Sequence, residues 1–247
     1  MHSINSLSLT HRYHDWIASS RHPRILHIFH DAANLINEDR VVLSIVTEQI
    51  GNGPFNLVVE DDIVFSDFLT IESLVTIHDN QLIIGDLTVK SDGAKLWSPR
   101  PDWEDLHANR KDILRHVELL PRLACPSLLP FELLSTFHAS IIYEELETSI
   151  DIARQLAGLG VGLTPAGDDF ILGTLYATWI IHEADTAKVL AEEIANKYAP
   201  LTTSLSAAWL RSAGDGEAGI LWHRFFDALL SSDPFQIQHG MDKILAV

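Results

Sequence analysis

The chain has 247 residues, enough for one large domain or two small ones, and 47% of them are hydrophobic, as in an ordinary globular protein. A formal net charge of −17 at pH 7 repels nucleic-acid phosphates and anionic lipids, so we expect neither nucleic acid nor a membrane as a partner. The single cysteine, Cys125, excludes an intrachain disulfide and a thiolate metal cluster, and it fits a reducing compartment.

The N-terminus lacks the apolar segment of a secretory signal. The longest strongly apolar run, residues 171–181, is 11 residues long, whereas a helix needs about 20 to cross a bilayer. We therefore expect a cytoplasmic protein without a membrane span.

Short apolar runs separated by turn residues fill the first hundred residues. The runs cover residues 24–29, 41–46, 55–60, 63–65, 74–77, 82–84 and 87–90. Turn residues lie between them at 51–54, 61–62, 79–80, 85–86 and 92–93. Because no long helical pattern separates the runs, we predict an antiparallel β-sheet that could close into a small barrel.

The pattern changes at residues 97–101, where Pro99 and Pro101 flank Arg100 and end the strand-like region. Beyond this point the apolar periodicity is helical. Helices are predicted over residues 102–120, 127–156 with a break near Tyr143, 170–182, 186–198, 202–213, 217–230 and from Asp233 onward. We therefore predict an α+β chain with a β-rich domain over residues 1–101 and a helical-bundle domain over residues 102–247.

A glycine-rich segment joins two of the predicted helices at residues 158–170, Gly-Leu-Gly-Val-Gly-Leu-Thr-Pro-Ala-Gly-Asp-Asp-Phe. Gly160, Gly162 and Gly167 can take positive φ without penalty, and alternating conformations of that kind turn successive N–H groups to one side and form an anion-binding nest. The segment lacks the lysine of a P-loop and the preceding strand of a dinucleotide-binding turn. We predict that it binds a small anion; the alternative is a flexible turn before a capped helix.

Three polar residues of this segment are candidate catalytic residues, Thr164, Asp168 and Asp169. Thr164 could donate a hydrogen bond to the anion. An aspartate could orient a substrate N–H group, act as a base or hold Mg²⁺, which is the only cofactor that this segment suggests. Capping of the following helix is the alternative role for at least one aspartate.

A second polar cluster, Thr202, Thr203 and Ser204 together with Ser206, lies at a predicted helix start, where hydroxyl and free N–H groups could hold phosphate or carboxylate. Simple N-capping is the alternative. We predict that this cluster and residues 160–169 face a common pocket.

Two further residues are candidate ligand contacts. Asn52 lies in the turn at residues 51–54, and Arg100 offers a guanidinium fork for a carboxylate or phosphate. A solvated surface position is the alternative for Arg100. The sequence has no metal-ligand motif among its 13 histidines.

Residues 158–173 resemble the hallmark of a bacterial family long described as a domain of unknown function and now linked to the AllH subunit of oxamate carbamoyltransferase. Residues 51–54, 97–101 and 202–216 also look like family positions, so the resemblance covers most of the chain. One difference lies near the C-terminus. The family usually carries Ser-Gly-x-Asp there, and this chain has His-Gly-Met-Asp at residues 239–242.

The resemblance implies a role in anaerobic allantoin degradation and purine catabolism. In the implied reaction, oxalurate and phosphate give oxamate and carbamoyl phosphate, and two other kinds of subunit are required. The expected partners are therefore one of these small anions and the other subunits of a hetero-oligomer. Carbamoyl transfer passes through an oxyanion, which each oriented N–H donor can stabilise by about 3 kcal/mol.

Other interpretations of the function stay open. The Ser-x-Arg-Thr-Arg and His-Pro-x-Gln patterns of the familiar transcarbamylases are absent from the sequence. The catalytic site therefore has another design, or its groups lie on a partner subunit. A non-catalytic scaffold or regulatory ligand-binding subunit is the main alternative, and the aspartate pair suggests a Mg²⁺-dependent phosphotransfer enzyme as a third.

Overall fold

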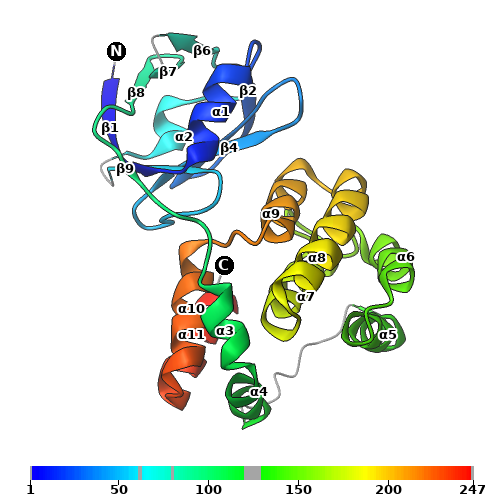
Figure 1. The fold of residues 1–247 in the computed structure, drawn as a ribbon. Helices are drawn as coiled ribbons and strands as arrows, with labels where there is room; N and C mark the ends of the chain where they lie inside the picture. Colours follow the sequence, from blue (N-terminus) through cyan, green and yellow to red (C-terminus); the bar gives the residue numbers. More distant parts are fainter. Residues whose placement is uncertain (1, 61–62, 79–80, 120–128, 246–247) are drawn as a thin grey trace. The chain divides into compact units, whose positions relative to one another are not determined.

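The computed structural model describes residues 2–60, 63–78, 81–119 and 129–245 (Figure 1). The chain separates into two compact units, Met1–Pro99 and Arg100–Val247, and each has its own hydrophobic core. The predicted turns at 61–62 and 79–80, the helix start at 127 and Cys125 lie outside the described residues.

The N-terminal unit is a nearly closed, barrel-like sheet, which confirms the predicted β-rich half. Its strands are β1 (His2–Leu9), β2 (Arg24–Ile28), β3 (Ala32–Ile36), β4 (Val42–Thr47), β5 (Asn56–Val59), β6 (Val75–His78), β7 (Gln81–Ile84), β8 (Leu87–Lys90) and β9 (Lys95–Leu96). The strand order is β2-β3-β4-β5-β1-β8-β7-β6, and β9 lies beside β1.

The sheet is mixed, whereas the sequence predicted antiparallel pairing throughout. Strand β1 is parallel to β8 and β9, and β4 is parallel to β5. The tight turns recognised in the sequence do join antiparallel neighbours, such as β6 with β7 and β7 with β8. The sequence pattern missed β1 because polar residues such as Asn5 and Ser6 interrupt its apolar positions. Local turn signals also carry no information on pairing between strands that are distant in sequence.

Two helices of the N-terminal unit were not predicted. Helix α1 (His11–Ser19) buries Tyr13, Trp16 and Ile17, whose i, i+3, i+4 spacing is typical of an amphipathic helix. Helix α2 (Phe65–Phe68) begins where the sequence predicted a strand over residues 63–65. Both contribute buried side chains to the core that the sheet encloses.

The C-terminal unit is helical, as predicted. Its helices are α3 (Trp103–Ala108), α4 (Arg110–Leu119), α5 (Phe131–Ile142), α6 (Leu146–Leu156), α7 (Ala166–Ile181), α8 (Ala184–Tyr198), α9 (Ser204–Gly214), α10 (Ile220–Ser231) and α11 (Pro234–Leu245), with a 3₁₀ turn, η1 (Ala199–Leu201). The predicted break near Tyr143 separates α5 from α6, and an unpredicted break at Asn109 divides the helix expected over residues 102–120.

Helix α7 is the central element of the C-terminal unit. It packs against α3, α5, α6, α8 and α9, and its residues Ile171, Leu175, Tyr176 and Trp179 are buried in the core (Figure 1). Asp169 is the only exposed residue of this helix. The glycine-rich segment leads directly into α7, so the core of the unit fixes the position of one end of that segment.

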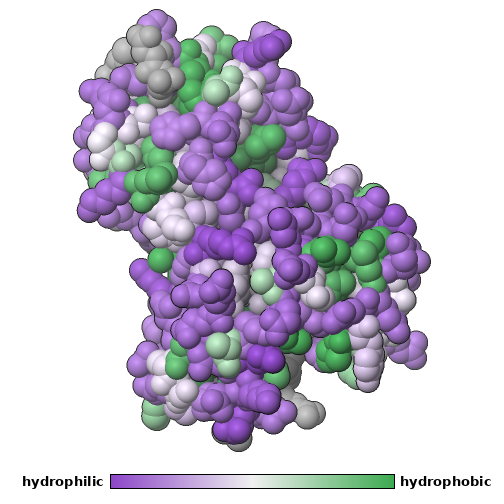
Figure 2. All heavy atoms as spheres, viewed as in Figure 1, coloured by the Kyte–Doolittle hydropathy of each residue, from purple (hydrophilic) through white to green (hydrophobic). Residues whose placement is uncertain are grey.

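The surface is mainly polar. Hydrophilic side chains cover most of the face shown in Figure 2, as the net charge leads one to expect. Large exposed apolar side chains include Leu74 in the N-terminal unit and Phe131 and Phe235 in the C-terminal unit. Within the described residues, none of the helices has the length and apolar character that a bilayer crossing requires.

Candidate functional site

The connection between α6 and α7, residues 157–165, has an unusual backbone and is called the glycine loop below. Gly158, Gly160 and Gly162 have φ angles of 65°, 126° and 101°. Side chains are strained at such angles, so glycine at these three positions permits the path of the loop. Gly160 and Gly162 therefore use the positive φ that the sequence analysis noted as open to them.

Gly167 does not use this freedom, because it lies in the first turn of α7 and has no positive φ. Glycine is needed there for space. A Cβ atom on Gly167 would lie 2.0 Å from the carbonyl oxygen of Leu156 and 3.3 Å from the Cβ of Leu159. The absent side chain lets the start of α7 cross the end of α6 in close contact.

Two backbone N–H groups at the ends of the loop make hydrogen bonds inside the protein. The N–H of Gly158 donates to Oδ1 of Asp168 at 2.9 Å, and the N–H of Gly167 donates to the carbonyl of Leu159 at 2.8 Å. In contrast, the N–H groups of residues 160–164 and of Ala166 have no acceptor within the described part of the chain. The glycine loop therefore offers a run of donors to solvent or to a ligand.

Asp168 holds the loop to two other elements. Its side chain is almost completely buried, with 2% of the residue exposed. Oδ1 accepts hydrogen bonds from the N–H of Gly158 and, at 2.5 Å, from the hydroxyl of Tyr198, and Oδ2 accepts one from the hydroxyl of Thr202. It does not cap α7, whose N-cap position is Pro165. The carboxylate thus connects the glycine loop with the end of α8 and with the segment before α9.

Asp169 differs from its neighbour because it is exposed at the start of α7. Partial desolvation raises the pKa of Asp169 from 3.8 to about 6, and the negative charge of Asp168 adds a smaller upward contribution. A carboxyl group that titrates this close to neutral pH can exchange a proton with a ligand. Thr164 is also exposed, and its hydroxyl has no partner among the described residues.

The second predicted cluster lies against the glycine loop. Thr203 is the N-cap of α9, where its Oγ1 accepts from the N–H of Ser206 at 3.1 Å. The hydroxyls of Thr203 and Ser206 both donate to the carbonyl of Leu163, at 2.8 and 3.2 Å. Ser204 is the first residue of α9 and is half-buried. The structure therefore brings residues 202–204 and the loop together, and capping explains only part of the role of Thr203.

The other two predicted contacts are not part of this arrangement. The guanidinium of Arg100 lies 4.9 Å from the ring centroid of Trp179 and donates to the carbonyl of Asp215 at 2.8 Å. Trp179 lies 13 residues beyond the first residue of α7, which is about 20 Å along the helix. Asn52 belongs to the N-terminal unit, where its Oδ1 accepts from the hydroxyl of Ser8 at 2.5 Å.

Sequence reasoning missed Tyr198, whose hydroxyl donates to Asp168, whereas it included Ser206 in the second polar cluster. Tyr198 lies 30 residues from Asp168, and no local pattern connects the two. Mg²⁺ does not suit the aspartate pair, because a cation would have to displace hydrogen-bond donors from Asp168. Within the described residues, no group of three or more histidine, cysteine, aspartate or glutamate side chains is arranged to hold a metal ion.

Two family models match the chain. The model of the AllH family N-terminal domain matches residues 5–96, and the model of the oxamate carbamoyltransferase subunit AllH matches residues 156–247. The second match includes the glycine loop, α7 and residues 202–204, and together the two matches span well over half of the chain. No curated protein and no solved structure gave a significant match.

Proposed function

The chain belongs to the AllH family, and on that basis we propose that it is a cytoplasmic subunit of an enzyme like oxamate carbamoyltransferase and works with other subunits. In the proposed reaction, a phosphate oxygen attacks the ureido carbon of oxalurate. The carbon–nitrogen bond then breaks, carbamoyl phosphate forms, and the proton lost by phosphate goes to the nitrogen of the leaving oxamate.

We propose that the glycine loop binds the phosphate or carboxylate group of the ligand. The observation that carries this proposal is the run of N–H donors at residues 160–164 and Ala166, which lack acceptors within the described part of the chain. Asp168 and Thr203 hold the loop from two sides, so these donors need little reordering when an anion binds. Thr164 would add its hydroxyl as a further donor.

The two aspartates have different proposed roles. Asp168 positions the loop through its three hydrogen bonds. Asp169 is free to contact the ligand, and its pKa of about 6 suits a carboxyl that takes the proton from phosphate and returns it to the leaving nitrogen. Donors in the loop that reach the developing oxyanion would each stabilise the transition state by about 3 kcal/mol.

A non-catalytic scaffold is the second candidate. The observation that favours it is the use of Asp168 and Thr203, two of the most distinctive polar residues, in internal hydrogen bonds. In this case the loop supports the fold of the subunit, and the catalytic groups lie on a partner.

Reconstitution of the enzyme from this chain and its partner subunits tests these roles. We expect Asp169→Asn to lower kcat at least tenfold and to remove a pH dependence near pH 6, and Thr164→Val to weaken phosphate binding about tenfold, or 1.4 kcal/mol. Val161→Ala is the matched control, because Val161 is 88% exposed in the same loop. Normal phosphate binding and turnover by both variants in an assembled complex would refute the loop site and favour the scaffold.

A further inference from the structure

A pocket of about 420 Å³ lies in the C-terminal unit at the far end of α7 from the glycine loop. Residues 100–104 and His107 line it on the side of α3, and Trp179 and residues 182–184 line it at the junction of α7 and α8. The α3 side lies between the two segments that match family models, so no family match covers it. Its volume is in the range of small-molecule sites.

One wall of the pocket presents a guanidinium group on a rigid aromatic support. Arg100 lies over Trp179, whose ring is stacked with that of Trp103 at 22° between the planes. The indole N–H of Trp103 is fixed by the carbonyl of Gly216 at 2.8 Å. One N–H of Arg100 donates to Asp215, and its other donors have no acceptor within the described residues. A planar guanidinium held in this way suits a carboxylate.

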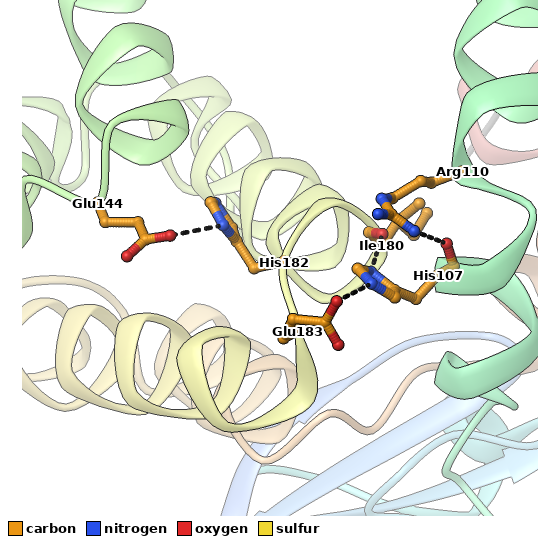
Figure 3. A network of polar contacts seen from close by, with 6 residues as sticks. All are labelled: His107, Arg110, Glu144, Ile180, His182 and Glu183. Carbon is orange, nitrogen blue, oxygen red and sulfur yellow. Dashed lines mark hydrogen bonds and ion pairs between the residues drawn. The ribbon is translucent and has the colours of Figure 1, made fainter.

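The pocket lining also includes a histidine that contacts a carboxylate, His107 and Glu183 (Figure 3). Nδ1 of His107 lies 3.0 Å from the carbonyl oxygen of Ile180, and its Nε2 lies 3.1 Å from Oε1 of Glu183. Both partners are acceptors, so the ring satisfies both contacts when each nitrogen donates. This arrangement fixes Glu183 at the rim of the pocket.

Two more carboxylates on α3 complete the lining. Oδ1 of Asp102 caps α3 by accepting from the N–H of Asp105 at 3.0 Å, and Oδ2 has no partner among the described residues. Glu104 is exposed and has no partner within the described part of the chain. The pocket therefore combines one guanidinium with acceptors for N–H groups. Asp102, Glu104 and Glu183 favour an anion that also carries N–H donors to pair with them, and phosphate has none.

From these contacts we propose that the pocket binds a small planar carboxylate that also carries amide or ureido N–H groups. The carboxylate pairs with Arg100, the N–H groups donate to Glu104 and Asp102, and the flat body of the ligand lies beside the two indoles. This assignment goes beyond the proposed function, because it concerns a second site and does not depend on phosphate binding at the glycine loop.

The test uses the full-length chain and four probes in NMR titrations. Oxamate has both a carboxylate and an amide, oxalate has only carboxylates, urea has only N–H groups, and phosphate serves as the competing anion. We expect oxamate to shift the indole signals of Trp103 and Trp179, and oxalate and urea to bind at least tenfold more weakly. Phosphate should leave these signals unchanged.

Two variants probe the contacts. Arg100→Lys keeps the charge but loses the fork, and Glu104→Ala removes an exposed acceptor; each should weaken oxamate binding about tenfold. Arg115→Lys, at an exposed ion pair on α4, is the matched control and should bind normally. Unchanged unfolding midpoints would show that the variants are folded, and Glu104→Ala decides the matter if Arg100→Lys is unstable.

The outcomes separate this proposal from the proposed function. Equal binding of oxamate, oxalate and urea, or normal oxamate binding by Glu104→Ala, would overturn the pocket assignment. Oxamate shifts confined to residues 160–169 would also overturn it, while leaving the glycine loop as a ligand site. If oxamate shifts the signals of the pocket and phosphate shifts no signal of residues 160–169, the result supports oxamate binding in the pocket and contradicts phosphate binding at the glycine loop.

Discussion

Replacing Asp168 with asparagine tests whether this buried carboxylate holds the glycine loop in place. The substitution keeps the shape of the side chain but removes its charge and replaces one oxygen with an NH₂ group. In the wild-type chain, the two oxygens accept from the N–H of Gly158 and from the hydroxyls of Tyr198 and Thr202. An amide has one oxygen, so when that oxygen keeps Gly158 and Tyr198, the hydroxyl of Thr202 must turn and accept from the new NH₂ group.

The expected loss follows from these three bonds. A hydrogen bond to a charged acceptor contributes about 1.5–3 kcal/mol, and a bond to a neutral acceptor contributes roughly half as much. All three bonds remain but each loses about half of its contribution, so the free energy of unfolding falls by about 2–4 kcal/mol. Because domains are typically stable by only about 5–15 kcal/mol, this is a large share of the total.

Urea unfolding followed by circular dichroism measures the effect. Asp151→Asn, on the exposed side of α6, is the control and should change stability by about 0.5 kcal/mol or less, because its ion pair with Arg154 is solvated. Tyr198→Phe should lose most of its effect when it is combined with Asp168→Asn. A loss below about 1 kcal/mol for Asp168→Asn would refute the reasoning, since the three bonds would then contribute little.

The remaining predictions concern the same region. Gly167→Ala should destabilise the chain by more than about 3 kcal/mol, because its Cβ would lie 2.0 Å from the carbonyl oxygen of Leu156. Gly173→Ala should not, because its Cβ would lie 4.0 Å from the ring of Trp222 and alanine raises helix propensity by up to about 1 kcal/mol; urea unfolding of the two variants measures the difference. Thr203→Ala should cost about 1 kcal/mol as a lost N-cap, and Thr203→Ser should restore most of it in the same assay. The pKa of Asp169 is higher in the folded chain than in the unfolded chain, so the folded chain binds this proton more tightly. The stabilisation that comes from protonated Asp169 is therefore present below about pH 4 and is lost as the pH rises through 6. Asp169→Asn should therefore be neutral near pH 4 and stabilising above pH 6, by about 1 kcal/mol after allowance for solvent screening, and unfolding curves that differ equally at both pH values would contradict this.

Periodic patterns made the main elements predictable. Strand β4 and helix α7 are strongly apolar and follow recognisable turns, and the sequence indicated both within a few residues of their observed bounds. Strand β1 was not predictable, because its parallel pairing with β8 depends on closure of the whole sheet and its own residues are largely polar. Local pattern thus predicts elements better than it predicts their partners.

The same limit applies to the candidate site. The unusual backbone of the glycine loop was predictable, since glycine is the residue that tolerates positive φ. The reason for glycine at position 167 was not predictable from the sequence. Glycine is selected both where a side chain would clash and where the backbone has positive φ, and the sequence does not distinguish the two cases. Asp168 could be recognised as a polar residue near a helix start, but its partners Tyr198 and Thr202 lie 30 and 34 residues away.

Helix α7 gives the two proposed sites a common mechanical element. Half of its 16 residues are buried and Asp169 is the only one that is exposed. Its first turn carries the carboxylate that holds the glycine loop, and its last turn carries Trp179, over which Arg100 lies. A continuous helix that packs against several neighbours moves as a rigid body, so a displacement of its first turn also displaces its last turn. Thermodynamic linkage then requires that phosphate alter the affinity for oxamate by the same factor as oxamate alters the affinity for phosphate, and titration of each ligand in the presence of the other measures that factor directly.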